Sequence, residues 1–213
     1  MKKTFILLAF FLLLISGVSA TWCNSTYARR NHFNITNIQA SVTTEFFLNI
    51  TYDSDMLGNG NDLIFYDDSC NQIPAHLENI DTSGNFITWI HKTFVTGNDV
   101  VWVYYKKPTA TGSWSASGVW NSTYKLVMYL NDTDDYSTNP KTATFNGATS
   151  TTVGVVDGGY SFDGTNDYIA LSNNESWRTL PLTIELLLNF RQAASNKGED
   201  EKIIDFMFLV LVS

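Results

Sequence analysis

The sequence predicts an all-β protein, and three features of the chain lead to this prediction. Apolar and polar residues alternate over short segments, which is the pattern of half-buried strands. Clusters of Gly, Asn, Asp and Ser separate these segments, and such clusters favour turns. No stretch after the first twenty residues shows a sustained helical period. Short strands with frequent turn signals are typical of a β-sandwich.

The first clear strand is expected at residues 45–52. Phe46, Leu48, Ile50 and Tyr52 fall on one face of this strand, and Phe47 is the one apolar residue on the other face. Turn-forming residues bound most of the later segments. Further strands are expected at residues 62–66, 86–94, 100–105, 125–130, 142–145, 159–162, 167–171, 182–190 and 202–205.

Residues 1–20 have the pattern of a secretory signal. Lys2 and Lys3 precede an unbroken apolar run over residues 5–15, and small residues lead to Ala20, where we expect cleavage. The apolar run is too short to cross a hydrocarbon core, which needs about 20 residues. The sequence therefore predicts a secreted or cell-surface protein with no membrane span in the mature chain.

The exported part of the chain divides into two modules. We expect a β-sandwich domain at residues 21–107, a linker at 108–118 that is rich in small and polar residues, and a second β-module at 119–213. The whole chain has a net charge of -8, and loss of Lys2 and Lys3 makes the mature chain more negative. An acidic chain is a poor partner for phosphate backbones, so we expect no nucleic-acid binding.

Two cysteines remain after the signal, Cys23 and Cys70. An oxidising compartment favours a disulfide between them, whereas free thiols or pairing with another chain are the alternatives. Asn-x-Ser/Thr sequons make Asn residues candidate glycosylation sites, although the abundance of Asn, Ser and Thr would produce several by chance. The sequons are at Asn24, Asn34, Asn49, Asn121, Asn131 and Asn174.

The second module resembles a known family. Residues 160–169 read Tyr-Ser-Phe-Asp-Gly-Thr-Asn-Asp-Tyr-Ile, and residues 180–185 read Leu-Pro-Leu-Thr-Ile-Glu. This pair of motifs resembles the LamG-like jelly roll of the concanavalin A-like lectins and glucanases, over residues 119–190. The resemblance implies a two-sheet jelly roll, and Gly164 suits the turn between its strands. The family needs a longer chain than residues 119–213, so we expect a partial jelly roll from a truncated or frame-shifted gene product.

The first module resembles a domain of unknown function that often precedes such jelly rolls in microbial surface proteins. The matching features are Trp22, Arg30 before Phe-Asn-Ile-Thr at 33–36, the segments 62–67 and 73–78, and Val-Trp-Val-Tyr-Tyr at 101–105. Where that family usually has Gly-Asn after the paired tyrosines, this chain has Lys106 and Lys107. The substitution removes a glycine turn, so the backbone is expected to bend differently there.

The sequence predicts no catalytic site. Glycosidases on related folds need paired carboxylates about 5–9.5 Å apart, whereas Glu199, Asp200 and Glu201 are consecutive residues in a polar loop. Three isolated histidines do not suggest a catalytic triad. Calcium is the one cofactor that the sequence suggests, with Asp163, Asn166 and Asp167 as candidate ligands. The alternative is that these side chains cap a turn.

Carbohydrate recognition or adhesion at the cell surface is the expected function, with a glycan or a cell-surface protein as partner. Sugars stack on exposed aromatic rings beside polar groups, and the candidate residues are Trp114, Trp120, Tyr136 and Trp177. Each of these could instead fill the end of a sheet. Two other functions stay open: an accessory fragment of a larger glycan-degrading enzyme, and a structural component of a surface layer.

Overall fold

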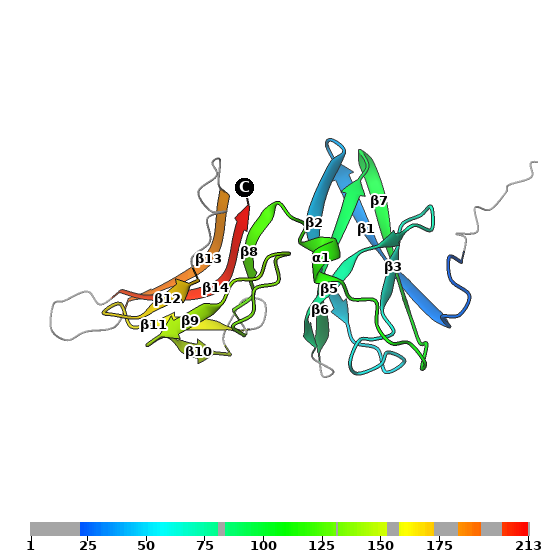
Figure 1. Ribbon diagram of the computed structural model, residues 1–213. Coiled ribbons are helices and arrows are strands. Elements are labelled where there is room, and N and C mark those ends of the chain that lie inside the picture. The colour runs from blue at the N-terminus through cyan, green and yellow to red at the C-terminus, as the bar shows by residue number, and fades with distance from the viewer. Residues whose placement is uncertain are drawn as a thin grey trace, which may run out of the picture.

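The computed structural model describes residues 22–80, 84–130, 132–152, 158–172, 183–192 and 202–212. The expected signal segment and three candidate site residues, Asn131, Asn174 and Trp177, lie outside these ranges. Within the described ranges the chain forms two β-rich bodies, which stand on either side of the short helix α1 (Figure 1). The prediction of an all-β chain is confirmed.

The first body contains two antiparallel sheets. One sheet has the strand order β1-β7-β3-β4, and the other has the order β2-β6-β5. The strands are β1 (Arg29–Ile38), β2 (Val42–Thr51), β3 (Ile64–Tyr66), β4 (Gln72–Ile73), β5 (Ala75–Ile80), β6 (Asn85–Phe94) and β7 (Gly97–Tyr105). Four predicted strands correspond to β2, β3, β6 and β7, whereas β1, β4 and β5 were not expected.

The core of the first body uses the alternation that predicted its strands. Leu48 and Ile50 of β2 are each 3% exposed and belong to a cluster that also holds Phe86 and Ile90 of β6. Burial of each such side chain contributes about 1.5–3 kcal/mol. Phe46 shares their face but lies at the rim, with 37% of its surface exposed. The predicted inward face of this strand is therefore correct, with its first residue only partly covered.

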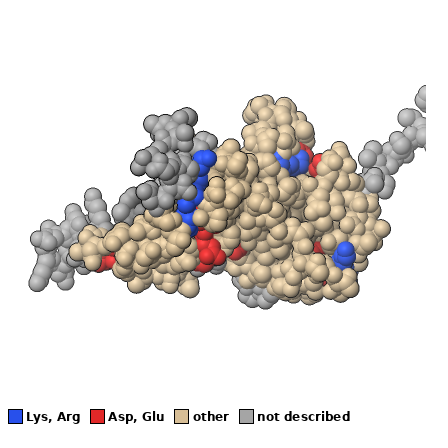
Figure 2. All heavy atoms as spheres, viewed as in Figure 1, with Lys and Arg blue, Asp and Glu red and all other residues tan. Residues whose placement is uncertain are grey.

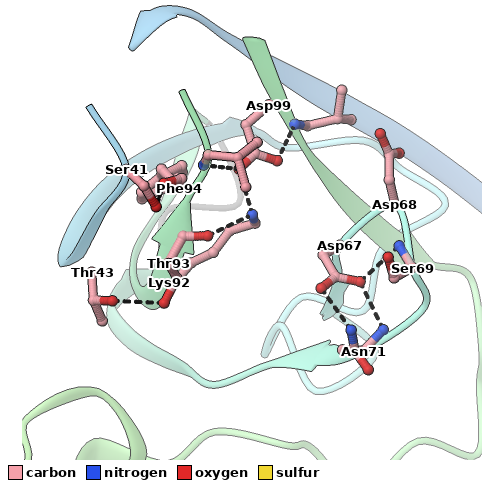
Figure 3. Close-up of polar contacts among 12 residues, drawn as sticks. Ser41, Thr43, Asp67, Asp68, Ser69, Asn71, Lys92, Thr93, Phe94 and Asp99 are labelled. Atoms are coloured by element: carbon pink, nitrogen blue, oxygen red, sulfur yellow. Dashed lines mark hydrogen bonds and ion pairs between the residues drawn. The ribbon is translucent and has the colours of Figure 1, made fainter. Parts of the chain in front are cut away.

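A buried ion pair joins the hairpin between β6 and β7. The Lys92 Nζ atom lies 2.7 Å from an Asp99 carboxylate oxygen, and both side chains are under 10% exposed (Figure 3). Burial raises the pKa of Asp99, but hydrogen bonds from Lys92 and from the backbone N–H groups of Val95 and Val100 outweigh it and hold the pKa below its usual value. The ion pair therefore holds the end of β6 close to the start of β7.

The N-terminal segment is bound to the outer face of the sheet that contains β3 and β7. Cys23 and Cys70 form a disulfide, which confirms the pairing favoured by the sequence. Beside it, Tyr27 packs with Tyr66 and Tyr104 in a second, smaller cluster. The chain-entropy model gives a 47-residue separation a stabilisation of about 4 kcal/mol.

The second body contains β8 to β14. The strands are β8 (Tyr124–Met128), β9 (Ala143–Asn146), β10 (Thr149–Thr151), β11 (Gly159–Phe162), β12 (Tyr168–Leu171), β13 (Thr183–Gln192) and β14 (Lys202–Val212). One sheet has the order β10-β11-β14-β13, with β8 also paired to β14, and β9 pairs with β12. Leu126, Met128, Tyr160 and Phe162 form the core, against which Phe145 packs.

The last strand extends further than the sequence predicted. We expected it at residues 202–205, but β14 runs from Lys202 to Val212 and pairs with β13 along one side. Along the other side it pairs with β11 and β8. Residues 206–212 are all apolar, so the two faces of this part of the strand do not differ in polarity and the sequence shows no alternation. The missing alternation explains why residues 206–212 were not recognised as a strand.

Residues 108–118, which the sequence predicted as a linker, lie against the first body. The backbone N–H of Ser115 donates a hydrogen bond of 2.7 Å to the carbonyl of Ala75 in β5, and Trp114 forms a bridge with Ala75. The Ser115 side chain then caps α1 (Ala116–Val119) by accepting from the N–H of Gly118. The end of this segment is therefore fixed on β5, where the chain enters the second body.

Candidate functional site

Trp120, one of the aromatic residues predicted to bind carbohydrate, is buried where the two bodies meet. It is 2% exposed and packs with Trp89 of β6 at 5.3 Å between ring centroids. Its indole N–H donates to the Tyr129 hydroxyl at 2.8 Å. The aromatic residues that join the bodies here are called the junction cluster. Its members are His76, Trp89, Trp120, Tyr124, Tyr129 and Tyr136.

The other three predicted carbohydrate-binding residues are either packed against other side chains or outside the described residues. Trp114 packs against the core of the first body. Tyr136 lies in the junction cluster, where its ring centroid is 4.6 Å from that of His76. Trp177 is outside the described residues. The structure thus places Trp120 and Tyr136 together, but in the contact between the bodies and not on an open surface.

The junction cluster lies on the outer face of the β2-β6-β5 sheet. Residues opposite one another on neighbouring strands share a face, and His76 of β5 lies opposite Trp89 of β6. His76 is 8% exposed, and its Nδ1 atom lies 2.7 Å from the Tyr129 hydroxyl. Burial lowers the pKa of His76 to about 4, although the charge of Asp132 opposes this shift. His76 is therefore neutral near pH 7.

Two glutamates accept hydrogen bonds at the rim of the junction cluster. Glu45 of β2 accepts from the Tyr124 hydroxyl and lies 2.8 Å from Nδ1 of His91. Glu78 accepts from the indole N–H of Trp89. Burial and the bond to Glu45 raise the pKa of Tyr124. In this arrangement both carboxylates hold aromatic side chains in place.

The candidate calcium ligands form a turn between β11 and β12. The Asp163 carboxylate accepts from the backbone N–H groups of Thr165 and Asn166, and these bonds lower the pKa of Asp163. The Asp167 carboxylate accepts from the N–H of Asp163 at 2.9 Å. Gly164 has a φ of +79°, as the turn requires. These contacts fit the turn-capping alternative, and calcium binding stays a prediction.

A cavity of about 370 Å³ lies beside the turn that follows β8. Tyr136, Lys141 and Asp134 are among the residues that line it. Asp135 is also at its wall, but both of its carboxylate oxygens accept hydrogen bonds, from Val127, Ser137 and Lys141. Asp135 therefore organises the turn.

The four described sequons fall into two classes. Asn34 of β1 and Asn49 of β2 are exposed on strands. Asn24 and Asn121 are half-buried, and the side-chain oxygen of each accepts from the threonine two residues later. The Asn24 side-chain nitrogen also donates to the Tyr66 hydroxyl at 3.1 Å. Among the described sequons, Asn34 and Asn49 are therefore the most accessible to a modifying enzyme.

The outer face of the β1-β7-β3-β4 sheet carries aromatic and charged residues that the sequence did not predict as a site. The Arg30 guanidinium lies 4.7 Å from the Trp22 ring centroid and 4.3 Å from that of Trp102. His32 packs beside Trp102 at 5.0 Å, and the Trp102 indole N–H donates to Asp68 at 2.7 Å. We call these five residues the tryptophan–arginine face.

Exposure separates this face from the junction cluster. Trp22 is 40% exposed, and His32 and Asp68 are also exposed. An exposed indole with donor and acceptor groups beside it is suited to bind a sugar ring. The sequence signal was the alternation of Arg30 and His32 along β1, which places both opposite the Trp102 end of β7.

Charged groups are few over the molecular face that Figure 2 presents, where uncharged residues cover most of the surface. In the part of the chain that the structure describes, no helix is long and apolar enough to span a membrane. The same part contains no group of three or more His, Cys, Asp or Glu side chains placed to hold a metal ion. No protein-family model, curated protein or solved structure matches this chain.

Proposed function

We propose that this protein is secreted or displayed at the cell surface and that it binds carbohydrate there without catalysing a reaction. The tryptophan–arginine face carries the proposal. Its exposed Trp22 ring supplies an apolar surface for a sugar. Asp68 and His32 supply polar groups beside Trp102, and Arg30 lies against the rings of both tryptophans. Adhesion to a glycan-bearing surface follows as its role.

The position of this face supports a binding role. The inner faces of the two sheets form the core, and the outer face of the β2-β6-β5 sheet carries Trp89 and His76, which contact the second body. The tryptophan–arginine face lies on the other sheet, where Arg30 holds the faces of Trp22 and Trp102 in fixed positions. Fixed side chains lose little entropy when a ligand binds.

We also propose that the second body has a LamG-like jelly-roll fold. The motif at residues 160–169 supports this assignment, because it forms β11, a turn at Gly164 with positive φ, and then β12. In this assignment the second body supports display of the first.

A glycan array followed by calorimetric titration of the best ligand tests the proposed function. Trp22→Ala is expected to weaken binding about five-fold or more, since a stacked aromatic ring contributes on the order of 1–3 kcal/mol. Tyr168→Ala is the matched control, because it removes an exposed aromatic ring from the second body. Chromatography of the glycan after incubation is expected to show no product.

Two outcomes would overturn the proposed function. One is an array on which no glycan is bound by the folded full chain. The other is equal loss of affinity in the Trp22 and Tyr168 variants, which would place the sugar elsewhere. Thermal unfolding of both variants separates a loss of binding from a loss of folding.

A further inference from the structure

The sheets of the first body have two long edges among the described strands. The strand orders place β1 and β4 at the edges of one sheet and β2 and β5 at the edges of the other. Of these, β4 has two residues, and β5 is contacted by Trp114 and Ser115. The remaining edges, β1 and β2, are ten residues each. Long edge strands invite pairing with another chain, which proteins prevent by several devices.

β1 carries two of these devices. Arg29 and Arg30 place charge at its start, and charged side chains disfavour edge-to-edge pairing. Its register against β7 shifts between Ile35 and Ile38, where Asn37 has a φ of +61°. Such an irregularity bends the strand and interrupts the row of backbone groups that a partner would use.

β2 has neither device. It pairs with β6 in a continuous register from Val42 to Thr51. Its one charged residue, Glu45, is bonded to Tyr124 and His91. Apolar side chains are exposed along the strand, since Val42 is 47% and Phe46 is 37% exposed. A regular, apolar and nearly uncharged edge of this length is the kind most prone to pair with a second copy.

The sequon of β2 lies on this unprotected edge. Asn49 and Thr51 are exposed, whereas Ile50 between them is 3% exposed and points into the core. We propose that Asn49 carries an N-linked glycan that prevents β2 from pairing with β2 of a second copy of this chain. A hydrated, branched sugar beside the strand would exclude a neighbouring backbone from the distance of about 4.8 Å that strand pairing needs.

The modification requires a polyisoprenoid-phosphate-linked oligosaccharide as the donor. Nδ2 of Asn49 forms a bond to C1 of the first sugar, and the bond between C1 and the phosphate oxygen of the carrier breaks. The carrier phosphate leaves with the electron pair, and Nδ2 loses one proton. The step is a group transfer without oxidation or reduction, and it occurs on the exported chain before β2 is folded into its sheet.

The test uses the full chain, secreted by a host that attaches N-linked glycans. Intact-mass analysis is expected to show a glycan at Asn49. Asn49→Gln is expected to lose that glycan and to shift from monomer to dimer or larger species in sedimentation velocity at equal concentration. Thr51→Val removes the sequon but keeps Asn49, and it must behave as Asn49→Gln does. Asn34→Gln is the matched control, because β1 keeps its charge and its irregular register.

A second substitution identifies the surface that associates. Val42→Lys places a charge on the exposed edge of β2, and added to Asn49→Gln it is expected to restore the monomer. An unmodified Asn49 in the secreted parent would overturn the proposal. The proposal would also be overturned if Asn49→Gln sediments as a monomer like the parent chain. It would be overturned too if Asn34→Gln forms dimers or larger species to the same extent as Asn49→Gln. None of these outcomes depends on whether the tryptophan–arginine face binds sugar.

Discussion

The Nδ1 atom of His76 lies 2.7 Å from the hydroxyl of Tyr129, 53 residues further along the chain and in the other body. The two rings are also stacked, with an angle of 26° between their planes. A buried imidazole at this position makes the contact between the bodies sensitive to protons, because a charged ring would have to be desolvated there.

The first prediction concerns pH. The pKa of His76 is about 4 in the folded chain and 6.5 in the unfolded chain, so between these values the unfolded state binds more protons. The free energy of unfolding should therefore fall as pH decreases from 6.5 to 4, by about 3 kcal/mol from this residue. Urea unfolding measured across this range checks the slope.

His76→Phe should flatten the pH dependence in this window while it keeps an aromatic ring in the junction cluster. His32→Phe is the matched control, because His32 is exposed on the tryptophan–arginine face. An unchanged slope in the His76 variant would show that other groups cause the pH dependence.

The second prediction concerns the contact between Trp120 and Trp89. Their centroids are 5.3 Å apart, and they come from different bodies. Trp120→Ala should lower the free energy of unfolding by about 3–5 kcal/mol, since it removes a buried indole and its hydrogen bond to Tyr129. A double-mutant cycle with Trp89→Ala should give a coupling of about 0.5–1.5 kcal/mol. Strict additivity would contradict direct contact between the rings.

The third prediction concerns the ion pair between Lys92 and Asp99. Lys92→Met should destabilise the chain by about 3–5 kcal/mol, because it leaves a carboxylate that is only 8% exposed without its cation. The pKa of Asp99 should also rise in this variant, since the bond from Lys92 holds it down. Carbon-detected NMR titration of the carboxyl group measures the pKa. The double variant Lys92→Met/Asp99→Asn should lose less stability than Lys92→Met, and an equal or larger loss would argue against an uncompensated charge.

Local patterns in the sequence predicted much of the first body. Alternation is a short-range signal, and it placed Leu48 and Ile50 in the core correctly. The same signal could not identify all of β14, because residues 206–212 are apolar at every position and show no alternation. The Cys23–Cys70 bond was predictable because the chain has only two cysteines, so they had only one intramolecular pairing.

The candidate site was less accessible to sequence reasoning. Trp120 follows a segment of small, polar residues, so the sequence left two interpretations of its side chain open: an exposed carbohydrate-binding ring or a ring that fills the end of a sheet. Its burial depends on Trp89 and His76, which are distant from Trp120 in the sequence. They approach Trp120 and Tyr129 only when the two bodies pack together. The tryptophan–arginine face likewise depends on the pairing of β1 with β7, which brings Arg30 close to Trp102.

The attachment of Ser115 to Ala75 also has a mechanical consequence when the two bodies are pulled apart. Tension between the bodies would meet no slack tether at this point of the chain. The load would act on the helix α1 and on the contact of Trp120 with Trp89. The two bodies would then bear force as one stiff unit until that aromatic contact gave way.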